Sequence, residues 1–387
     1  VGDNQTITGT TVTEFYKLKL SGTGTKNLVD IDCIVQDSLL LYASEFATDS
    51  NILFAVGTEP GLITRSSGFV SSLLNGGLSR NTATLFSYLF PVGSSLSTLR
   101  YRPVEITSVD SSQNTYLVRM VNNNASLDGF DVNTFQNPPV CAINNQFYHQ
   151  IKQTTGTGNP DLTIYYDESA DGYFEGISRW NNPNVSVFKW YDLGSVSYNN
   201  SGALTGVEKV GIDFSVSEFY ALDKISPQIV ASGDTVIEIG NFAPLQASGG
   251  NNYIWSPTDY LSCSNCPNPT ATPETTTTYI VTGEKNGCYS TDTVVVTIDG
   301  KYNYFVPNIF SPNDDGHNDR LFFYGSVIKW FTLIVYDRWG EKVFETSSLS
   351  EGWDGIFRGK PMNTAVFVYM LHGEFVSGNI FEEKGNI

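Results

Sequence analysis

An acidic loop near the end of the chain has the residue types that a calcium site needs. Asn313, Asp315 and Asp319 supply side-chain oxygens at close intervals, and Gly316 lies among them. Calcium prefers oxygen ligands, and glycine permits the sharp turn that lets carboxylates converge. The full twelve-residue calcium loop is absent, because its last position is Phe322 rather than glutamate. The loop therefore predicts either a calcium site at Asn313, Asp315 and Asp319 or a turn held by side-chain hydrogen bonds.

A second acidic loop, residues 166–175, contains Asp167, Glu168, Asp171 and Glu175. A pair of carboxylates can serve as the acid and base of a glycosidase, or can bind a cation. The flanking residues do not indicate a sugar-binding cleft. We therefore expect a solvated hairpin loop at this place.

The histidines do not form a recognisable catalytic arrangement. His149, His317 and His372 are far apart in the sequence, and no GxSxG motif accompanies them. Exposed or capping roles are expected for these side chains. The sequence thus predicts no catalytic residue and a protein that is not an enzyme.

The aromatic residues around Trp180 and Trp190 could line a glycan-binding face. Phe188 and Trp190 are two residues apart, which is the spacing of side chains on one face of a strand. We therefore expect this segment to be a core strand.

The five cysteines favour disulfide bonds over a metal site. Cys263, Cys266 and Cys288 are close together in the sequence, but no second CxxC or pair of histidines lies near them to complete a zinc site. The pairing stays open: Cys263 with Cys266, or either of them with Cys288. With five cysteines, one thiol stays free or bonds another molecule.

Composition indicates an exported protein made of strands. The net charge of −18 excludes nucleic acid and anionic lipid as partners, since both need a basic surface. Abundant Phe and Tyr, together with many Gly, are typical of strands and tight turns, and no apolar run approaches the length of a membrane span. The chain begins Val1-Gly2-Asp3, so we expect that a signal peptide has been removed.

Short strands separated by turn residues predict an all-β protein of several domains, dominated by antiparallel sandwiches. The pattern in the first region, residues 1–225, predicts a sandwich or a short solenoid leading into a sandwich. Residues 226–300 and 301–387 are predicted to form two further domains. In the last domain, residues 331–336 and 341–345 are expected to form a hairpin around a turn at 337–340.

Four motifs occur in a fixed order near the C-terminus and resemble the gliding-motility-associated C-terminal domain of Bacteroidetes, the type B sorting module of type IX secretion. The matching residues are Ser311, Pro312, Asn313, Asp315, Gly316, Asn318 and Asp319, then Asp337, Arg338, Trp339 and Gly340 with Val343 and Phe344, then Trp353, Asp354 and Gly355, and finally 366–369.

Two weaker resemblances concern the rest of the chain. Residues 226–300, with Trp255 at their centre, look like a PKD/Ig-like domain, in which that Trp would lie between the sheets. Residues 68–80, 90–93 and 101–106 resemble a β-rich region of Bacteroidetes surface proteins to which no activity is attached.

The resemblances imply a function and a location. The chain is expected to be a non-enzymatic protein of the cell surface or medium, handled by the type IX translocon and its outer-membrane shuttle protein. It would act as an adhesin or as a structural subunit of a surface, gliding or secretion assembly, without a cofactor other than the candidate calcium. The alternatives are a secreted polysaccharide-active hydrolase and a calcium-dependent carbohydrate-binding protein.

Overall fold

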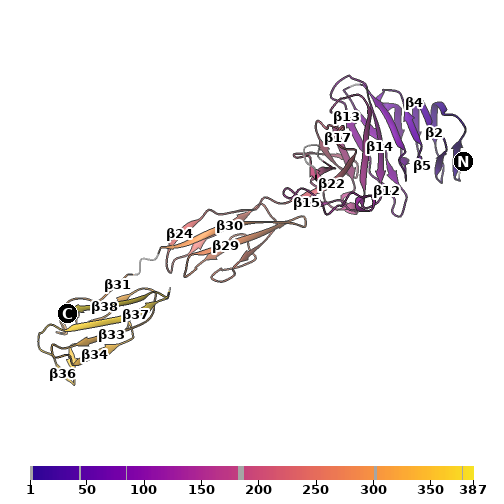
Figure 1. Cartoon of the computed structure of the whole chain (residues 1–387). Helices are drawn as coiled ribbons and strands as arrows, with labels where there is room; N and C mark the ends of the chain where they lie inside the picture. Colours follow the sequence, from indigo (N-terminus) through magenta and orange to yellow (C-terminus); the bar gives the residue numbers. More distant parts are fainter. Residues whose placement is uncertain (1–2, 43–44, 84, 182–186, 300–302, 377) are drawn as a thin grey trace. The chain divides into compact units, whose positions relative to one another are not determined.

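The computed structural model is built almost wholly from β-strands (Figure 1). It describes residues 3–42, 45–83, 85–181, 187–299, 303–376 and 378–387. Contacts divide the chain into two units, Val1–Ser226 with Asn286–Tyr289, and Pro227–Lys285 with Ser290–Ile387. The second unit holds two separate hydrophobic cores, one within 229–296 and one within 306–381. The division into three domains stays a prediction.

The chain starts as a short parallel β-solenoid, in which successive turns add strands alternately to two sheets. Within each sheet the neighbours run parallel. One sheet contains β1 (Gln5–Thr8), β3 (Lys26–Val29), β5 (Glu45–Ala47) and β8 (Phe69–Ser71); the other begins with β2 (Thr13–Leu20), β4 (Cys33–Leu41), β6 (Ile52–Ala55), β7 (Ile63–Arg65) and β9 (Gly77–Thr82), and η1 spans Pro60–Leu62.

Alternating apolar residues explain why these strands stack. In β4, Val35, Leu39 and Leu41 are fully buried, and Leu53 continues the same core from the next turn. Side chains two residues apart share one face of a strand. Each turn of the solenoid therefore packs its apolar side chains against those of the preceding turn. Of the two alternatives for residues 1–225, a sandwich or a short solenoid leading into a sandwich, the described residues between 5 and 82 agree with the solenoid and not with an antiparallel sandwich.

The large sheet then changes from parallel to antiparallel pairing at β9. This strand is parallel to β6 on one side and antiparallel to β14 on the other. Among the described residues the sheet reaches eleven strands. Its antiparallel part contains β14 (Asn114–Val121), β16 (Tyr148–Thr155), β22 (Phe219–Ile225), β18 (Gly176–Trp180) and β19 (Trp190–Asp192), with β15 (Val140–Ile143) paired to β22.

A second antiparallel sheet covers one face of the first and completes its core. Val118 and Ile151 of the large sheet belong to the same hydrophobic cluster as Ile106 and Ile164 of the second. The second sheet contains β10 (Ser87–Phe90), β13 (Val104–Thr107), β17 (Asp161–Tyr166), β21 (Leu204–Lys209) and β20 (Ser197–Ser201); β11 (Gly93–Ser94) pairs with β12 (Arg100–Tyr101), and the short helices are η2 (Ala125–Asp128) and α1 (Glu168–Asp171).

The other face of the large sheet carries a separate small core, which includes Tyr148, Trp190 and Ala221. The segment after β14 covers part of it, with Ala125 and Val132 buried. Phe130, Trp180 and Phe219 pack at the rim of this core and also line a pocket.

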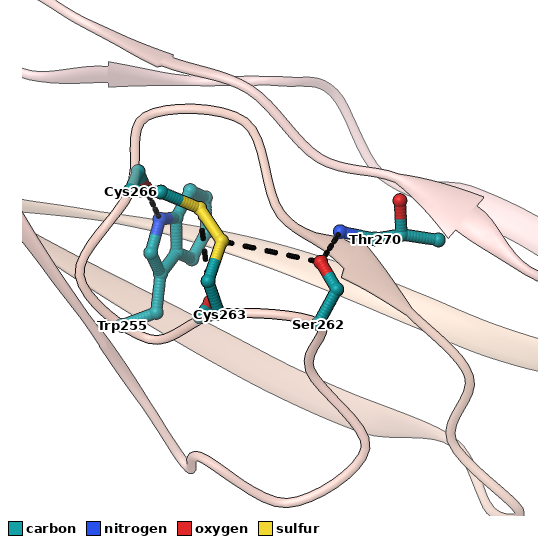
Figure 2. The surroundings of a disulfide bond; sticks show 5 residues. All are labelled: Trp255, Ser262, Cys263, Cys266 and Thr270. Carbon is teal, nitrogen blue, oxygen red and sulfur yellow. Dashed lines mark hydrogen bonds between the residues drawn. A yellow bond between two sulfur atoms is a disulfide. The ribbon is translucent and has the colours of Figure 1, made fainter.

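Residues 230–299 form a four-stranded sheet with two short strand pairs. Trp255 is fully buried, and its indole Nε1 donates a hydrogen bond of 3.0 Å to the carbonyl of Cys266 (Figure 2). The PKD/Ig-like assignment stays a prediction. The sheet contains β24 (Thr235–Glu238), β30 (Cys288–Asp299), β29 (Thr277–Lys285) and β27 (Asn252–Ser256), and the pairs are β23 (Val230–Ala231) with β26 (Ala247–Ser248) and β25 (Ala243–Pro244) with β28 (Thr270–Ala271).

Two disulfides are formed, and one was not foreseen. Cys263 bonds Cys266 beside Trp255, which is one of the pairings that the sequence left open (Figure 2). Cys288 bonds Cys141 rather than Cys263 or Cys266, closing 147 residues of chain. The alternatives that joined Cys288 to the CxxC pair are wrong, because Cys141 of β15 faces it instead. Cys33 is a free, buried thiol.

The C-terminal region is a four-stranded antiparallel sheet with its own aromatic core. The hairpin expected around 337–340 is present between β33 and β34. The sheet contains β34 (Lys342–Thr346), β33 (Ile328–Tyr336), β37 (Val368–Phe375) and β38 (Ile380–Asn386), and the short pairs are β31 (Tyr304–Phe305) with β32 (Tyr324–Gly325) and β35 (Ile356–Phe357) with β36 (Lys360–Pro361).

Candidate functional site

The acidic loop of the C-terminal region is a closed network of side-chain-to-backbone hydrogen bonds. The Asp319 carboxylate accepts hydrogen bonds from the backbone N–H groups of Asn313, Asp314 and Gly316, at 3.1, 2.7 and 2.8 Å. Desolvation raises the pKa of Asp319, but these N–H donors together hold it below its ordinary value. Asp319 thus keeps its charge and ties the loop together.

The other polar residues of the loop also bind within it. Asp315 accepts from the backbone N–H of His317 at 2.8 Å and from the Asn313 amide at 2.9 Å. Ser311 donates its N–H to the carbonyl of Asn318, which has a positive φ of 52°. Such contacts are those of Asx turns.

The calcium assignment to Asn313, Asp315 and Asp319 stays a prediction. Within the described residues, no group of three or more His, Cys, Asp or Glu side chains could hold a metal ion. The contacts in the loop agree with the second interpretation from the sequence, a hydrogen-bonded turn.

A second motif forms the exposed turn between β33 and β34. Asp337 accepts hydrogen bonds from the N–H groups of Trp339 and Glu341, at 2.8 and 2.9 Å, and Gly340 takes a positive φ of 81°. Trp339 is 81% exposed, and the Arg338 guanidinium lies over its ring at 5.3 Å. The turn therefore presents a large aromatic side chain to solvent.

The third motif joins the core to the acidic loop. Trp353 is buried, and its indole donates to the carbonyl of Ile356 at 3.2 Å. Asp354 accepts from the N–H of Ile356 at 3.0 Å. Gly355 has a positive φ of 74°, and a Cβ on it would lie 2.9 Å from the Pro312 ring. Only glycine fits both the conformation and the contact.

Three of the four motifs meet at one pocket of about 610 Å³. Its wall combines residues 311–313, Trp353, Gly355 and residues 366–367. Two apolar side chains at its rim are largely exposed, Ile309 at 73% and Val366 at 63%. Residues 337–340 do not line it. Ile309, Phe310 and Met362 also contribute, and no spacing rule in the sequence pointed to them.

The second acidic loop is not a solvated hairpin. Asp171 is fully buried and forms ion pairs with both Arg102 and Arg100, the latter at 3.4 Å. Asp167 begins α1 by accepting from the N–H of Ser169 at 3.1 Å. The expectation of a solvated loop is wrong for Asp171, because two arginines from β12 and its continuation reach it. Glu168 in the same loop is exposed.

The histidines differ among themselves. His149 is fully buried, its Nε2 lies 2.8 Å from the carbonyl of Arg102, and burial lowers its pKa to about 4. The expected exposed role is wrong for this residue. His317 is exposed in the acidic loop, and His372 lies 3.0 Å from the Glu382 carboxylate on the C-terminal sheet.

The comparisons with known proteins identify the C-terminal region. Residues 304–386 match the CHU_C type IX secretion signal domain. The chain therefore carries a type IX secretion signal, which implies interaction with that secretion machinery and export to the cell surface or the extracellular space. None of the curated proteins matches the chain. Among the described residues, no helix is long and apolar enough to cross a membrane.

Three solved structures show weak likeness. They are the tetra-tandem repeat in the extending region of a large adhesion protein (10% identity, 76% of this chain and 82% of that one, TM-score 0.27), dimeric latent PorU from Porphyromonas gingivalis (9%, 64% and 33%, 0.18) and the BSP domain of a biofilm-associated protein (9%, 74% and 74%, 0.16). At these TM-scores, none of the three establishes a shared fold.

Proposed function

We propose that this chain is a non-enzymatic surface protein of a Bacteroidetes bacterium, exported through its C-terminal signal domain. Outside the cell it acts as an adhesin or as a structural subunit of a surface, gliding or secretion assembly. The observation that carries the proposal is the secretion signal domain at residues 304–386. The parts of the chain before it supply the function at the destination.

The pocket of the signal domain is the surface that we assign to recognition. It brings residues 311–313 and 366–367 together with Gly355, although these segments are far apart in the sequence. Exposed apolar side chains beside a concave surface mark protein interaction sites. The type IX translocon and its outer-membrane shuttle protein are the partners proposed for it, with Trp339 on the neighbouring turn as a separate contact.

The test is export of the full chain in a bacterium with a working type IX system. The chain carries a signal peptide and an epitope ahead of Val1, and protease accessibility on intact cells is measured. Ile309→Asp and Val366→Asp, which change exposed side chains, are expected to reduce export at least severalfold, and Trp339→Ala is expected to reduce it less. Ile254→Asp, on a strand of the middle region and equally exposed at 64%, is the matched control and is expected to be exported normally.

Two outcomes overturn the proposal. One is equal export of the wild type and of a chain lacking residues 304–387. The other is unchanged export in a strain whose type IX system is inactive. Unchanged export of both pocket variants would keep the signal domain but reject its pocket as the recognition surface.

A further inference from the structure

A second pocket lies in the first unit, on the face of the large sheet that turns away from the second sheet. Its volume is about 540 Å³. Phe130 comes from the segment after η2, Trp180 from the end of β18 and Phe219 from the start of β22. Lys152 of β16 and Glu218 also line it. Three separate segments thus place aromatic rings in one hollow.

The aromatic rings form a supported platform. The Phe130 and Phe219 rings lie 4.1 Å apart at an interplanar angle of 34°, and Trp180 meets Phe130 edge-on at 5.7 Å. Behind them Trp180 contacts Trp190 at 5.5 Å, and Trp190 is fully buried. Packing against a buried ring restricts the rotamers of the platform, so little entropy is lost when a ligand binds.

Among the residues that the structure describes, none covers the platform completely from the solvent side. Trp180, Phe130 and Phe219 are only partly buried, and Phe188 at the same pocket is 64% exposed. The sequence predicted that this segment is a core strand. That interpretation is right for Trp190 and wrong for Phe188, because the strand β19 begins only at Trp190.

An ion pair with no net charge lies beside the rings. The Lys152 ammonium lies 2.8 Å from the Glu218 carboxylate, and the Gln150 amide donates to the other Glu218 oxygen at 3.1 Å. The Lys152 side chain is 50% exposed, so hydrogen-bond donors and acceptors stay accessible there. Since the two charges cancel, the pocket offers no net attraction to a charged ligand.

We propose that this pocket binds a neutral carbohydrate. A pyranose ring has apolar C–H faces that lie against aromatic rings, and hydroxyls that take both donors and acceptors. Binding pockets of this kind are concave, mostly apolar and aromatic, with few polar groups that fix orientation. The chain's net charge of −18 also repels anionic polymers. The inference rests on the proposed surface function, since it names the ligand class that an adhesin of this chain contacts.

Native affinity electrophoresis of the purified full chain tests the proposal. The gels contain a neutral β-glucan, a xylan or a galactomannan, and polygalacturonate serves as the anionic comparison. The wild type is expected to be retarded by at least one neutral polysaccharide and not by polygalacturonate. Trp180→Ala is expected to weaken the apparent affinity about tenfold, which corresponds to roughly 1.4 kcal/mol, and Lys152→Ala severalfold.

Trp330→Ala is the matched control, because Trp330 is a partly exposed Trp of the signal domain at 41%. Its retardation is expected to equal that of the wild type. If Trp180→Ala unfolds the first unit, Phe188→Ala replaces it, since that exposed ring supports no core. Absence of retardation in every neutral gel overturns the proposal, as does equal retardation of wild type, Trp180→Ala and Phe188→Ala. Failed export with intact binding would overturn the proposed function alone.

Discussion

The first unit and the signal domain use charged residues in opposite ways. The first unit buries Arg80, Arg102, Asp171, His149 and Asp223 within its core. Among the described residues from 303 onward, the single buried polar side chain is Thr346, and the acidic residues of the motifs lie in turns at the surface. The first unit therefore combines an apolar core with buried ionisable side chains, whereas the described part of the signal domain has an apolar and aromatic core without them.

A polar motif does not by itself indicate a surface site. Arg80 lies in a segment that resembles surface proteins, yet it is fully buried and donates to the carbonyls of Leu89 and Glu59 at 2.7 and 3.0 Å. Burial lowers its pKa to about 10. A buried guanidinium needs hydrogen-bond partners for its N–H groups. An arginine in such a motif can therefore be needed for folding and not for binding.

Among the changes that test the contrast between the two regions, replacing Asp171 is expected to lower the free energy of unfolding most. Asp171→Ala leaves Arg102 and Arg100 without their buried counter-ion, and loss of one partner of a buried pair costs about 3–5 kcal/mol. The free energy of unfolding of the first unit, measured by urea titration, is expected to fall by that amount. Glu168→Ala, an exposed neighbour in α1, is the control and is expected to change it by less than about 0.5 kcal/mol.

The matching change in the signal domain is Asp354→Ala. Its pair with Arg320 spans 4.0 Å, and both side chains are about half exposed. Such surface pairs are worth about 0–1 kcal/mol. A loss at Asp354 as large as that at Asp171 would contradict the contrast between the two regions.

The pH dependence of stability gives the next effect, and it comes from Asp223. This side chain is fully buried, one carboxylate oxygen lacks a hydrogen-bond partner among the described residues, and Ser178 donates to the other. Burial raises its pKa to about 8, although the Ser178 hydrogen bond lowers it, and the carboxylates of Asp192 and Glu175 raise it further. Between pH 4 and 8 the folded state therefore holds a proton that the unfolded state releases.

The sign follows from this proton balance. Stability of the first unit is expected to fall as pH rises across the window, by at most about 1.4 kcal/mol per pH unit. His149 opposes this below its unfolded pKa, since its folded pKa is lowered to about 4. The Asp223 slope is therefore best measured between pH 7 and 8, where His149 is largely neutral in both states, and is worth about 1 kcal/mol there.

Asp223→Asn is expected to abolish this slope in calorimetry of the first unit. Asp131→Asn serves as the control, because Asp131 is exposed and its pKa is lowered by the N–H of Asn133 and the Thr134 hydroxyl. A wild-type stability that stays level or rises from pH 7 to 8 would show that Asp223 is ionised in the folded protein.

The sequence predicted the strands and the turns better than it predicted the contacts between distant segments. The hairpin around residues 337–340 follows from local turn chemistry, because Asp337 and Gly340 satisfy it within four residues. The partner of Cys288 is Cys141, 147 residues away, and no local rule fixes that choice. Parallel pairing in the solenoid is equally long-range, since a period-two apolar pattern suits parallel and antiparallel sheets alike.

The same limit applies to the candidate sites. The motif residues of the signal domain could be selected from the sequence, but the pocket that joins residues 311–313 to Gly355 required the fold. Asp171 appeared to be a solvated loop residue because its partners, Arg100 and Arg102, are about seventy positions earlier in the chain.

The smallest expected effect concerns Asp319, and it separates the two interpretations of the acidic loop. If the loop is a turn held by hydrogen bonds, Asp319→Ala removes acceptors for three backbone N–H groups that water can reach, and the melting temperature of the signal domain falls by only a few degrees. A chelator added to the wild type then leaves the melting temperature unchanged. If calcium binds there, the chelator lowers it and added calcium restores it in the wild type but not in Asp319→Ala. We expect no effect of the chelator, because the Asp319 carboxylate already has its hydrogen-bond partners inside the loop. A calcium-dependent rise in the melting temperature of the wild type would reverse this interpretation. The surface loop of the signal domain would then depend on a bound ion, whereas its core is apolar and aromatic.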